Sequence, residues 1–481
     1  MTTTSRAGGR VAQRLFGLGE LAVWLFVILI FASSLASGDW VFVGIILGPL
    51  VAFCVAALGM RAVAVLWLVG SPTLFVLANN VLQVVPFVTV ERALFAGLLG
   101  LVVLSYTFRR LEPVEQLAVE KPMALFLLLA LISLIGALIF VSAAQWKSDI
   151  AFYIQGYFMP LMAFILLRRL PWRESDAKLL VYMFLFVGVF LGFLGVSQVF
   201  FGMDKLTPTW TEVINEGRAT GVFSNATEFG SSCAVALLLG IFVFYDQKDP
   251  MVRALAVSAA ASAAVGLAIS QTRAPWLATL MCLGWIFLCD PRTRFAFVMG
   301  AALGGVVLAA VLPVFMESDV FRGRVLEMDP IYNRLALFAT ALHMIARYPL
   351  SGVGFGNDTF PNAKDDYLQS FGPVSAQYAA DVGPPHNEFV HIAVLGGIPL
   401  LVCFIAIWIM LWRSLGRIRR LAGISATTRG LALYGQVIIL QFLVISLFVD
   451  SGKLIFLNAF TFAFAGIVHA VASRRASHSN R

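Results

Sequence analysis

Arg218, Arg273 and His386 are the residues whose types could together perform a group transfer, although they come from distant parts of the 481-residue chain. A guanidinium group is permanently charged, and its planar fork matches two phosphate oxygens at once. Histidine titrates near neutral pH and is the commonest general base. Two phosphate clamps and one base suit transfer from a lipid-linked diphosphate to a sugar hydroxyl, provided that the fold brings all three to one face of a membrane.

The composition indicates a membrane protein. Hydrophobic residues make up 60% of the chain and charged residues 12%, and the mean hydropathy is +0.89. An average soluble domain is about 25% charged, so this chain lacks the charge to cover a water-facing surface. This excludes a large soluble enzyme, a disordered protein and a nucleic-acid-binding module. All five cysteines lie in apolar runs, which indicates buried thiols and no metal-ligand set.

The apolar stretches predict an all-α polytopic fold. A bilayer core takes about 20 apolar residues per helix. The candidate spans are 21–37, 40–59, 62–86, 93–108, 123–141, 150–167, 179–201, 228–245, 253–271, 274–289, 294–315, 388–412, 431–449 and 454–472. Two of them are short, and a third is interrupted by Gly70-Ser71-Pro72 and by two asparagines, so we expect 12 to 14 transmembrane helices.

The distribution of basic residues predicts the orientation. With the N-terminus in the cytoplasm, most of the 34 Lys and Arg fall on cytoplasmic connections, and both termini are then cytoplasmic. The net charge of +8 is therefore read as a topology signal. The expected domains are a bundle of about 11 spans over 1–315, a periplasmic loop over 316–387, C-terminal helices over 388–472 and a cytoplasmic tail over 473–481.

The long periplasmic loop is predicted to be partly helical. Apolar residues recur at helical spacing between Ile331 and Ala346, and Pro349 ends that helix. The apolar positions are Leu335, Phe338, Ala339, Leu342 and Ile345. We expect this helix to lie on the membrane or to cap the bundle. The Gly-x-Gly-x-Gly of 352–356 that follows is interpreted as a tight turn or a flexible lid, because a nucleotide fingerprint needs a preceding strand.

The loop ends at the candidate base. Pro384 and Pro385 restrict the chain directly before His386 and should hold it at the external surface. His391 lies five residues further on, about 140° away around a helix. A metal site that uses both histidines is therefore not expected, and His391 is interpreted as a packed or interfacial histidine.

Four segments resemble the motifs of one family. They are Arg218-Ala-Thr-Gly-Val-Phe-Ser-Asn, Gln271-Thr-Arg-Ala, Tyr348-Pro-Leu-Ser-Gly-Val-Gly, and His386-Asn387 followed by Leu395-Gly-Gly. They are similar to the Arg-x-x-Gly, Ser/Thr-Arg-Gly/Ala, Pro-Leu-x-Gly-x-Gly and His-Asn…Gly elements of the O-antigen ligase and polymerase superfamily. These are bacterial integral membrane glycosyltransferases of polysaccharide assembly. The resemblance covers roughly 150–470 and is strongest between 218 and 400.

The resemblance implies a metal-independent, inverting glycosyltransferase without a cofactor, in the inner membrane with its site facing the periplasm. Arg218 and Arg273 would contact the diphosphate, His386 would activate the acceptor hydroxyl, and Arg334 would be a weaker third clamp. The implied partners are an undecaprenyl-diphosphate-linked glycan donor, a glycan or lipid A–core acceptor, membrane lipids, and a chain-length regulator or flippase. No nucleic acid is expected.

Four functions stay open at this point: a polymerase, a ligase, a transporter and a scaffold in a glycan-assembly complex. The ligase form of the signature places Gly, Thr or Val four residues after its glycine, where this chain has Leu401. This departure favours a polymerase that extends its own repeat units over a ligase that moves a finished chain to lipid A–core. A transporter is the alternative from another class, although the predicted spans are nearly free of the charged residues that transport uses.

Overall fold

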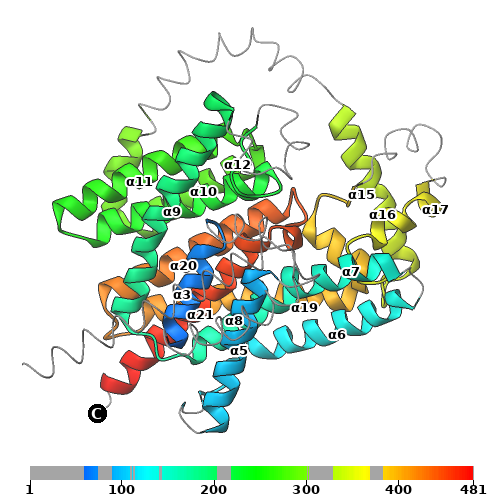
Figure 1. Ribbon diagram of the computed structural model, residues 1–481, viewed down its shortest axis with the longest axis horizontal. Coiled ribbons are helices and arrows are strands. Elements are labelled where there is room, and N and C mark those ends of the chain that lie inside the picture. Colours follow the sequence, from blue (N-terminus) through cyan, green and yellow to red (C-terminus); the bar gives the residue numbers. More distant parts are fainter. Residues whose placement is uncertain are drawn as a thin grey trace, which may run out of the picture.

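The structure is a computed structural model that describes residues 59–73, 89–108, 111, 114–139, 143–202, 218–300, 302, 329–368 and 383–479. Every regular element in this described part of the chain is a helix (Figure 1). Nine of the described helices are long and apolar enough to cross a membrane, and a strongly bent helix pair would make ten. The prediction of an all-α polytopic membrane protein is confirmed.

The helices follow one another in this order: α3 (Met60–Gly70), α5 (Val90–Thr107), α6 (Glu120–Leu138), α7 (Ala143–Tyr153), η1 (Ile154–Phe158), α8 (Met159–Arg169), α9 (Glu174–Phe201), α10 (Ala226–Asp246), α11 (Pro250–Ile269), α12 (Arg273–Cys289), η4 (Pro291–Thr293), α15 (Asp329–Arg347), α16 (Thr359–Ala363), α17 (Asp365–Leu368), α19 (Glu388–Arg420), α20 (Ala426–Ser446), η6 (Ser451–Lys453) and α21 (Ile455–Ser479). The predicted spans at 21–37 and 40–59 lie outside the described residues, apart from Gly59. Those at 62–86 and 294–315 are described to residues 73 and 300, with residue 302 in addition.

The bundle has two chemically different ends. The outer end is defined here as the one where α19 and α21 begin, which the charge distribution predicts to be periplasmic. The basic end is the opposite one, where α19 finishes with Arg417, Arg419 and Arg420 in its last turn. Ion pairs join helices at the basic end, including Arg168 to Glu120 at 2.7 Å and Lys178 to Asp246 at 3.3 Å.

Helix α21 runs through the middle of the bundle, and α8 and α20 pack along it (Figure 1). In the most apolar stretch of α21, 94% of the residues are buried. The contact with α8 is backbone-close, because a Cβ added at Gly466 would lie 2.7 Å from the Phe164 carbonyl oxygen. Small residues allow such close approach between helices that share an apolar solvent and gain little from further hydrophobic burial.

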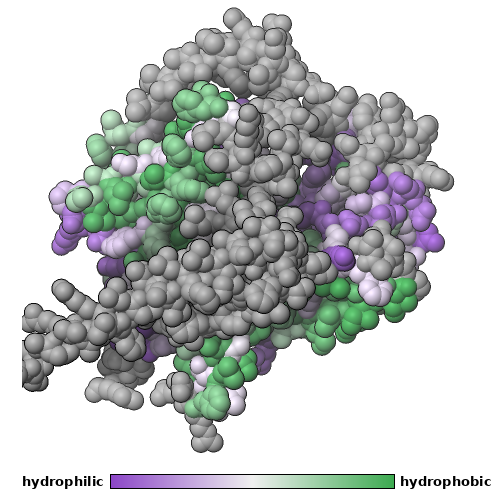
Figure 2. Space-filling model, viewed as in Figure 1, coloured by the Kyte–Doolittle hydropathy of each residue, from purple (hydrophilic) through white to green (hydrophobic). Residues whose placement is uncertain are grey.

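Helices α9, α10, α11 and α12 form a second group on one side of α20 (Figure 1). Glycine and alanine residues lie where these helices contact one another. A Cβ added at Gly188 on α9 would lie 3.1 Å from the Ala259 carbonyl oxygen of α11. Outward-facing side chains are apolar where lipid is expected. Figure 2 shows apolar surface over α6, where Leu128, Ile132 and Ile135 are each more than half exposed. Such exposed apolar faces are typical of lipid contact.

The span predicted at 388–412 is broken at its first third. Within α19, Gly396 and Gly397 leave the helical conformation, and Gly397 has a φ of 72°. The interruption frees the carbonyl groups of Val394 and Leu395, which accept hydrogen bonds from the Val353 and Gly354 amides at 2.8 and 3.2 Å. The glycine-rich segment 352–356 is therefore a tight turn packed against the break, which satisfies the backbone groups that a broken span exposes.

The predicted amphipathic helix is present as α15, but a different face packs against the protein. Leu337, Ala341 and Met344 are buried against Phe360, Tyr367 and Val394. Of the five positions that we expected to define the apolar face, Leu335, Phe338 and Leu342 are at least 36% exposed, whereas Ile345 packs against this cluster. Both faces of α15 carry apolar residues. The helical spacing of apolar residues therefore predicted the helix, but it could not predict which of the two faces packs against α19. The exposed stripe remains available for the membrane surface.

Gly397→Ala is expected to destabilise the protein strongly. A Cβ at Gly397 would lie 2.6 Å from the Leu350 backbone, and its positive φ costs an L-residue about 1–2 kcal/mol more. Gly423→Ala is the matched control, because Gly423 has a φ of 75° but nothing within 4 Å of an added Cβ. Thermal unfolding in detergent should show a larger loss for Gly397→Ala; equal losses would mean that the packing against Leu350 contributes nothing.

Candidate active site

The segments of Arg218 and Arg273 meet at the outer end of α9 and α11. The Ala219 amide donates to the Ile269 carbonyl at 3.2 Å, and Arg273 is the first residue of α12. The turn between α11 and α12 is closed by a 2.8 Å hydrogen bond between the hydroxyls of Ser270 and Thr272. The two arginine motifs, 55 positions apart in the sequence, therefore lie side by side. Arg218 is half-buried and Arg273 is exposed.

A glutamine on α9 fixes the backbone that follows Arg218. The Gln198 Oε1 accepts from the amides of Thr220 and Gly221 at 3.1 and 2.8 Å, and its Nε2 donates to the Gly221 carbonyl at 2.9 Å. Gly221 has a φ of 60°, and Phe229 leaves no room for a side chain there. These contacts explain the glycine at position 221, and they hold the arginine segment at the bundle end.

His386 stands directly before α19 in a strained conformation. Its φ is 54°, which is uncommon for a residue with a side chain, and strain of this kind is concentrated at functional sites. The next residue holds it there: the Asn387 side chain caps α19 by accepting from the Val390 amide at 3.1 Å and donates to the Leu447 carbonyl at 3.2 Å. The His-Asn pair thus combines a half-buried imidazole with the residue that fixes its backbone.

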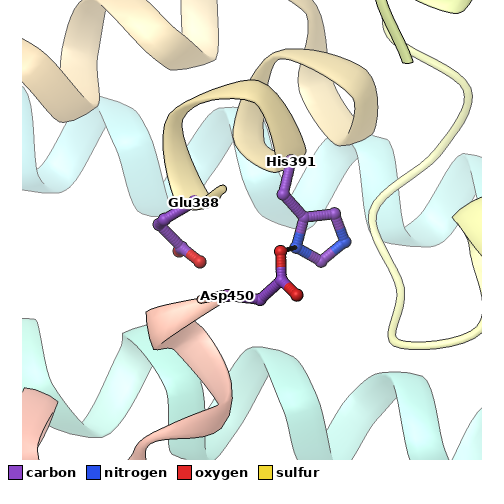
Figure 3. A group of neighbouring side chains, drawn as sticks. All are labelled: Glu388, His391 and Asp450. Atoms are coloured by element: carbon purple, nitrogen blue, oxygen red, sulfur yellow. Dashed lines mark ion pairs between the residues drawn. The ribbon is translucent and has the colours of Figure 1, made fainter. Parts of the chain in front are cut away.

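Beneath His386 lies a buried polar cluster formed by Glu388, His391 and Asp450. Figure 3 shows the first two projecting from α19 toward Asp450, which comes from the connection between α20 and α21. The His391 Nδ1 lies 3.5 Å from the Asp450 Oδ1, and all three residues are at most 1% exposed. His391 is packed, as predicted, but it is packed against a carboxylate. The Glu388-x-x-His391 spacing was a signal for this pair, whereas nothing in the sequence pointed to Asp450.

A π-helical turn and the start of α21 add a third and a fourth segment to this region. Pro160 has no N–H to donate to the Gly156 carbonyl, so the helix widens over η1, and the Asn458 side chain supplies the missing hydrogen bond. The widened turn places the Tyr157 hydroxyl 2.6 Å from the Glu388 Oε1. The Gly452 amide donates to the other Glu388 oxygen at 3.1 Å. Four separate elements therefore converge below His386.

The residues of this cluster are also the group of described residues that could hold a metal ion. The candidate ligand atoms of Glu388, His391 and Asp450 all lie within 4.8 Å of one another. However, both Glu388 oxygens already accept hydrogen bonds, and the charge of Lys453 acts on the same group of residues. These contacts favour a structural role for Glu388, whose hydrogen bonds anchor the start of α19. The imidazole and carboxylate oxygens would still suit a divalent cation chemically.

Asp450 should make stability depend on pH. Burial raises its pKa to about 7, and the neighbouring Glu388 adds to the rise while Lys453 opposes it. Its unfolded pKa is about 4, so its contribution to stability is complete below about pH 4 and is lost as the pH rises through about 7. Asp450→Asn should therefore flatten the fall of Tm over that range. Asp366→Asn, at an exposed carboxyl, is the control. Parallel profiles for wild type and Asp450→Asn would contradict this assignment.

Further contacts tie the arginine segments to the segment that carries His386. The Phe456 amide at the start of α21 donates to the Glu228 Oε1 at the start of α10, at 2.9 Å. The adjacent η6 turn supplies the Gly452 amide to Glu388. The segments that carry Arg218, Arg273 and His386 are thus connected to one another at the outer end of the bundle. Arg334 is exposed on α15, which packs against α19. No described contact links Arg334 to the other three.

Comparison with known families gives one match. Residues 257–405 match a family model described as O-antigen ligase, which confirms the resemblance predicted from the motifs. The matched stretch contains Arg273, Arg334 and His386, together with the glycine-rich turn and the break in α19. Arg218 lies before it. No curated protein matches the sequence.

Proposed function

We propose, starting from the O-antigen ligase match of residues 257–405, that this multi-pass membrane protein transfers a glycan from an undecaprenyl-diphosphate-linked donor to a sugar hydroxyl. The reaction takes place at the periplasmic face of the inner membrane, and the product is a polysaccharide extended by repeat units. The family match supports ligase- or polymerase-type glycan transfer. The observation that carries the finer proposal is the shared outer end, where the Ala219–Ile269 hydrogen bond joins the two arginine segments.

The proposed chemistry assigns each residue one task. His386 takes the proton from the acceptor hydroxyl as its oxygen attacks the anomeric carbon of the donor. The bond between that carbon and the diphosphate oxygen breaks, and the diphosphate leaves with the bonding electrons. Attack opposite to the leaving group inverts the anomeric centre. Arg218 and Arg273 hold the diphosphate and stabilise the charge that develops on it, while the exposed Arg334 meets the donor from α15.

No residue of this scheme needs a metal ion to neutralise the leaving group, because the guanidinium groups supply positive charge at that point. The buried cluster of Glu388, His391 and Asp450 positions the His386-Asn387 backbone from below. The other proposed partners are membrane lipids and a chain-length regulator or flippase that handles the same lipid-linked glycans.

A ligase is the second candidate, because the matching family model is described as O-antigen ligase. Purified protein in vesicles should receive a lipid-diphosphate oligosaccharide, with and without lipid A–core as acceptor. A ladder of lengthening chains on the lipid carrier is expected for the polymerase. Transfer of intact chains to lipid A–core without self-extension would identify the ligase instead. Absence of any glycan transfer by folded protein would overturn the proposal.

A further inference from the structure

A cavity of about 530 Å³ opens at the basic end, remote from the proposed active site. Its walls come from the last turn of α12, the last turns of α19 and the first turns of α20. Because α19 begins beside His386 and finishes at this cavity, the length of a membrane-spanning helix separates the two sites. The volume is within the roughly 300–1,000 Å³ of small-molecule sites.

The cavity is strongly basic. Arg292, Arg419, Arg420 and Arg429 line it, against the single carboxylate of Asp290. Asp290 is paired with Arg292 at 2.7 Å. The Arg419 Nη1 donates to the neutral Gln436 Oε1 at 2.7 Å, which holds that guanidinium in place. Among the described residues, no carboxylate forms an ion pair with Arg420 or Arg429. An excess of positive charge therefore faces one concave space.

Aromatic and apolar groups border the same cavity. Trp285 and Trp412 line it with their ring centroids 5.2 Å apart. Tryptophan is enriched where the bilayer core meets the head groups. Cys289 and Leu433 add further apolar surface to its walls. The cavity thus combines cationic groups at head-group depth with apolar wall residues that a lipid could contact.

We propose that this cavity binds the phosphate head group of an anionic phospholipid from the leaflet at the basic end. Guanidinium forks match phosphate oxygens bidentately, and basic pockets between helices at the cytoplasmic boundary are suited to such head groups. The apolar wall residues Trp285, Trp412 and Leu433 favour a lipid over free phosphate, because a soluble anion would gain nothing from contact with them. The site is independent of the proposed glycan transfer.

The test is lipid binding by the purified full chain, measured by native mass spectrometry and by thermal shift. Phosphatidylglycerol is expected to bind and to raise the Tm, whereas phosphatidylcholine is not. The double variant Arg420→Gln and Arg429→Gln should weaken phosphatidylglycerol binding about tenfold or more, since each lost guanidinium removes charge-assisted hydrogen bonds. Arg417→Gln is the control, because Arg417 is exposed on the same helix but does not line the cavity.

Two outcomes would overturn the proposal. One is a double variant that binds phosphatidylglycerol as well as Arg417→Gln does. The other is inorganic phosphate that binds the wild type and competes with the lipid at equal concentration, which would identify a soluble-anion site. If the double variant does not fold, Arg429→Gln alone should lower the affinity relative to Arg417→Gln, and equal affinities would again contradict the assignment.

Discussion

His386→Ala is expected to abolish glycan transfer while the protein stays folded. Loss of a positioned general base costs about 10²–10⁴-fold in rate. The side chain is half-buried in front of α19 and belongs to neither hydrophobic core. The neighbouring Asn387 still caps the helix through the Val390 amide. The measurement is the rate of transfer from a lipid-diphosphate oligosaccharide in vesicles, with thermal unfolding as the folding check.

His343→Ala is the matched control for this experiment. His343 is exposed on α15, so its loss removes an imidazole from the same region without touching the proposed base. Full transfer activity in His386→Ala would remove His386 from the chemistry. A protein that moves a solute across vesicles equally well with and without His386 would instead support a transporter.

Arg218→Lys and Arg273→Lys are expected to lower transfer severely even though the charge is kept. An ammonium cannot reproduce the planar fork, and a charge-assisted hydrogen bond contributes about 1.5–3 kcal/mol, which corresponds to roughly 10–150-fold per arginine. The loss should fall mainly on kcat, because the diphosphate gains charge as the bond to the sugar breaks. Rates with saturating and with limiting donor separate the two parameters.

Arg417→Lys is the control for the arginine variants, since Arg417 is exposed at the basic end of α19. It should transfer glycan like the wild type. Wild-type activity in Arg218→Lys would remove Arg218 from the site, and the same result in Arg273→Lys would remove Arg273. If both single variants lose activity but the double variant loses no more than either one, the two arginines act as one unit on the donor.

Described contacts fix arginine-bearing segments at both ends of the bundle. At the outer end, the segments of Arg218 and Arg273 are fixed through backbone contacts, by Gln198 and by the Ala219–Ile269 bond. At the basic end, Arg419 is fixed through its own side chain by Gln436. The first arrangement fixes the backbone segments that carry the two arginines of the proposed site. The second arrangement places the Arg419 side chain in the wall of the basic cavity, which suits the proposed phospholipid head group.

Much of this architecture follows from local sequence. Apolar runs of about 20 residues require helices in a bilayer, because every backbone polar group must be satisfied within its own segment. The predicted spans at 93–108, 123–141, 179–201, 228–245 and 253–271 each correspond to a helix. The amphipathic helix at 331–346 and the turn after Pro349 are also present. Local motifs sufficed to predict the resemblance that the match of residues 257–405 confirms.

The buried cluster, the break in α19 and the packed face of α15 depend on partners far away in the chain. Asp450 reaches His391 from 59 positions further on, and Tyr157 reaches Glu388 across 231. The stripe of α15 that carries Leu337 could be distinguished from the exposed stripe only once α19 lay against it. Helical periodicity defines the faces of a helix but not their neighbours, since in lipid the choice among apolar faces is made by the fit of side chains against adjacent helices.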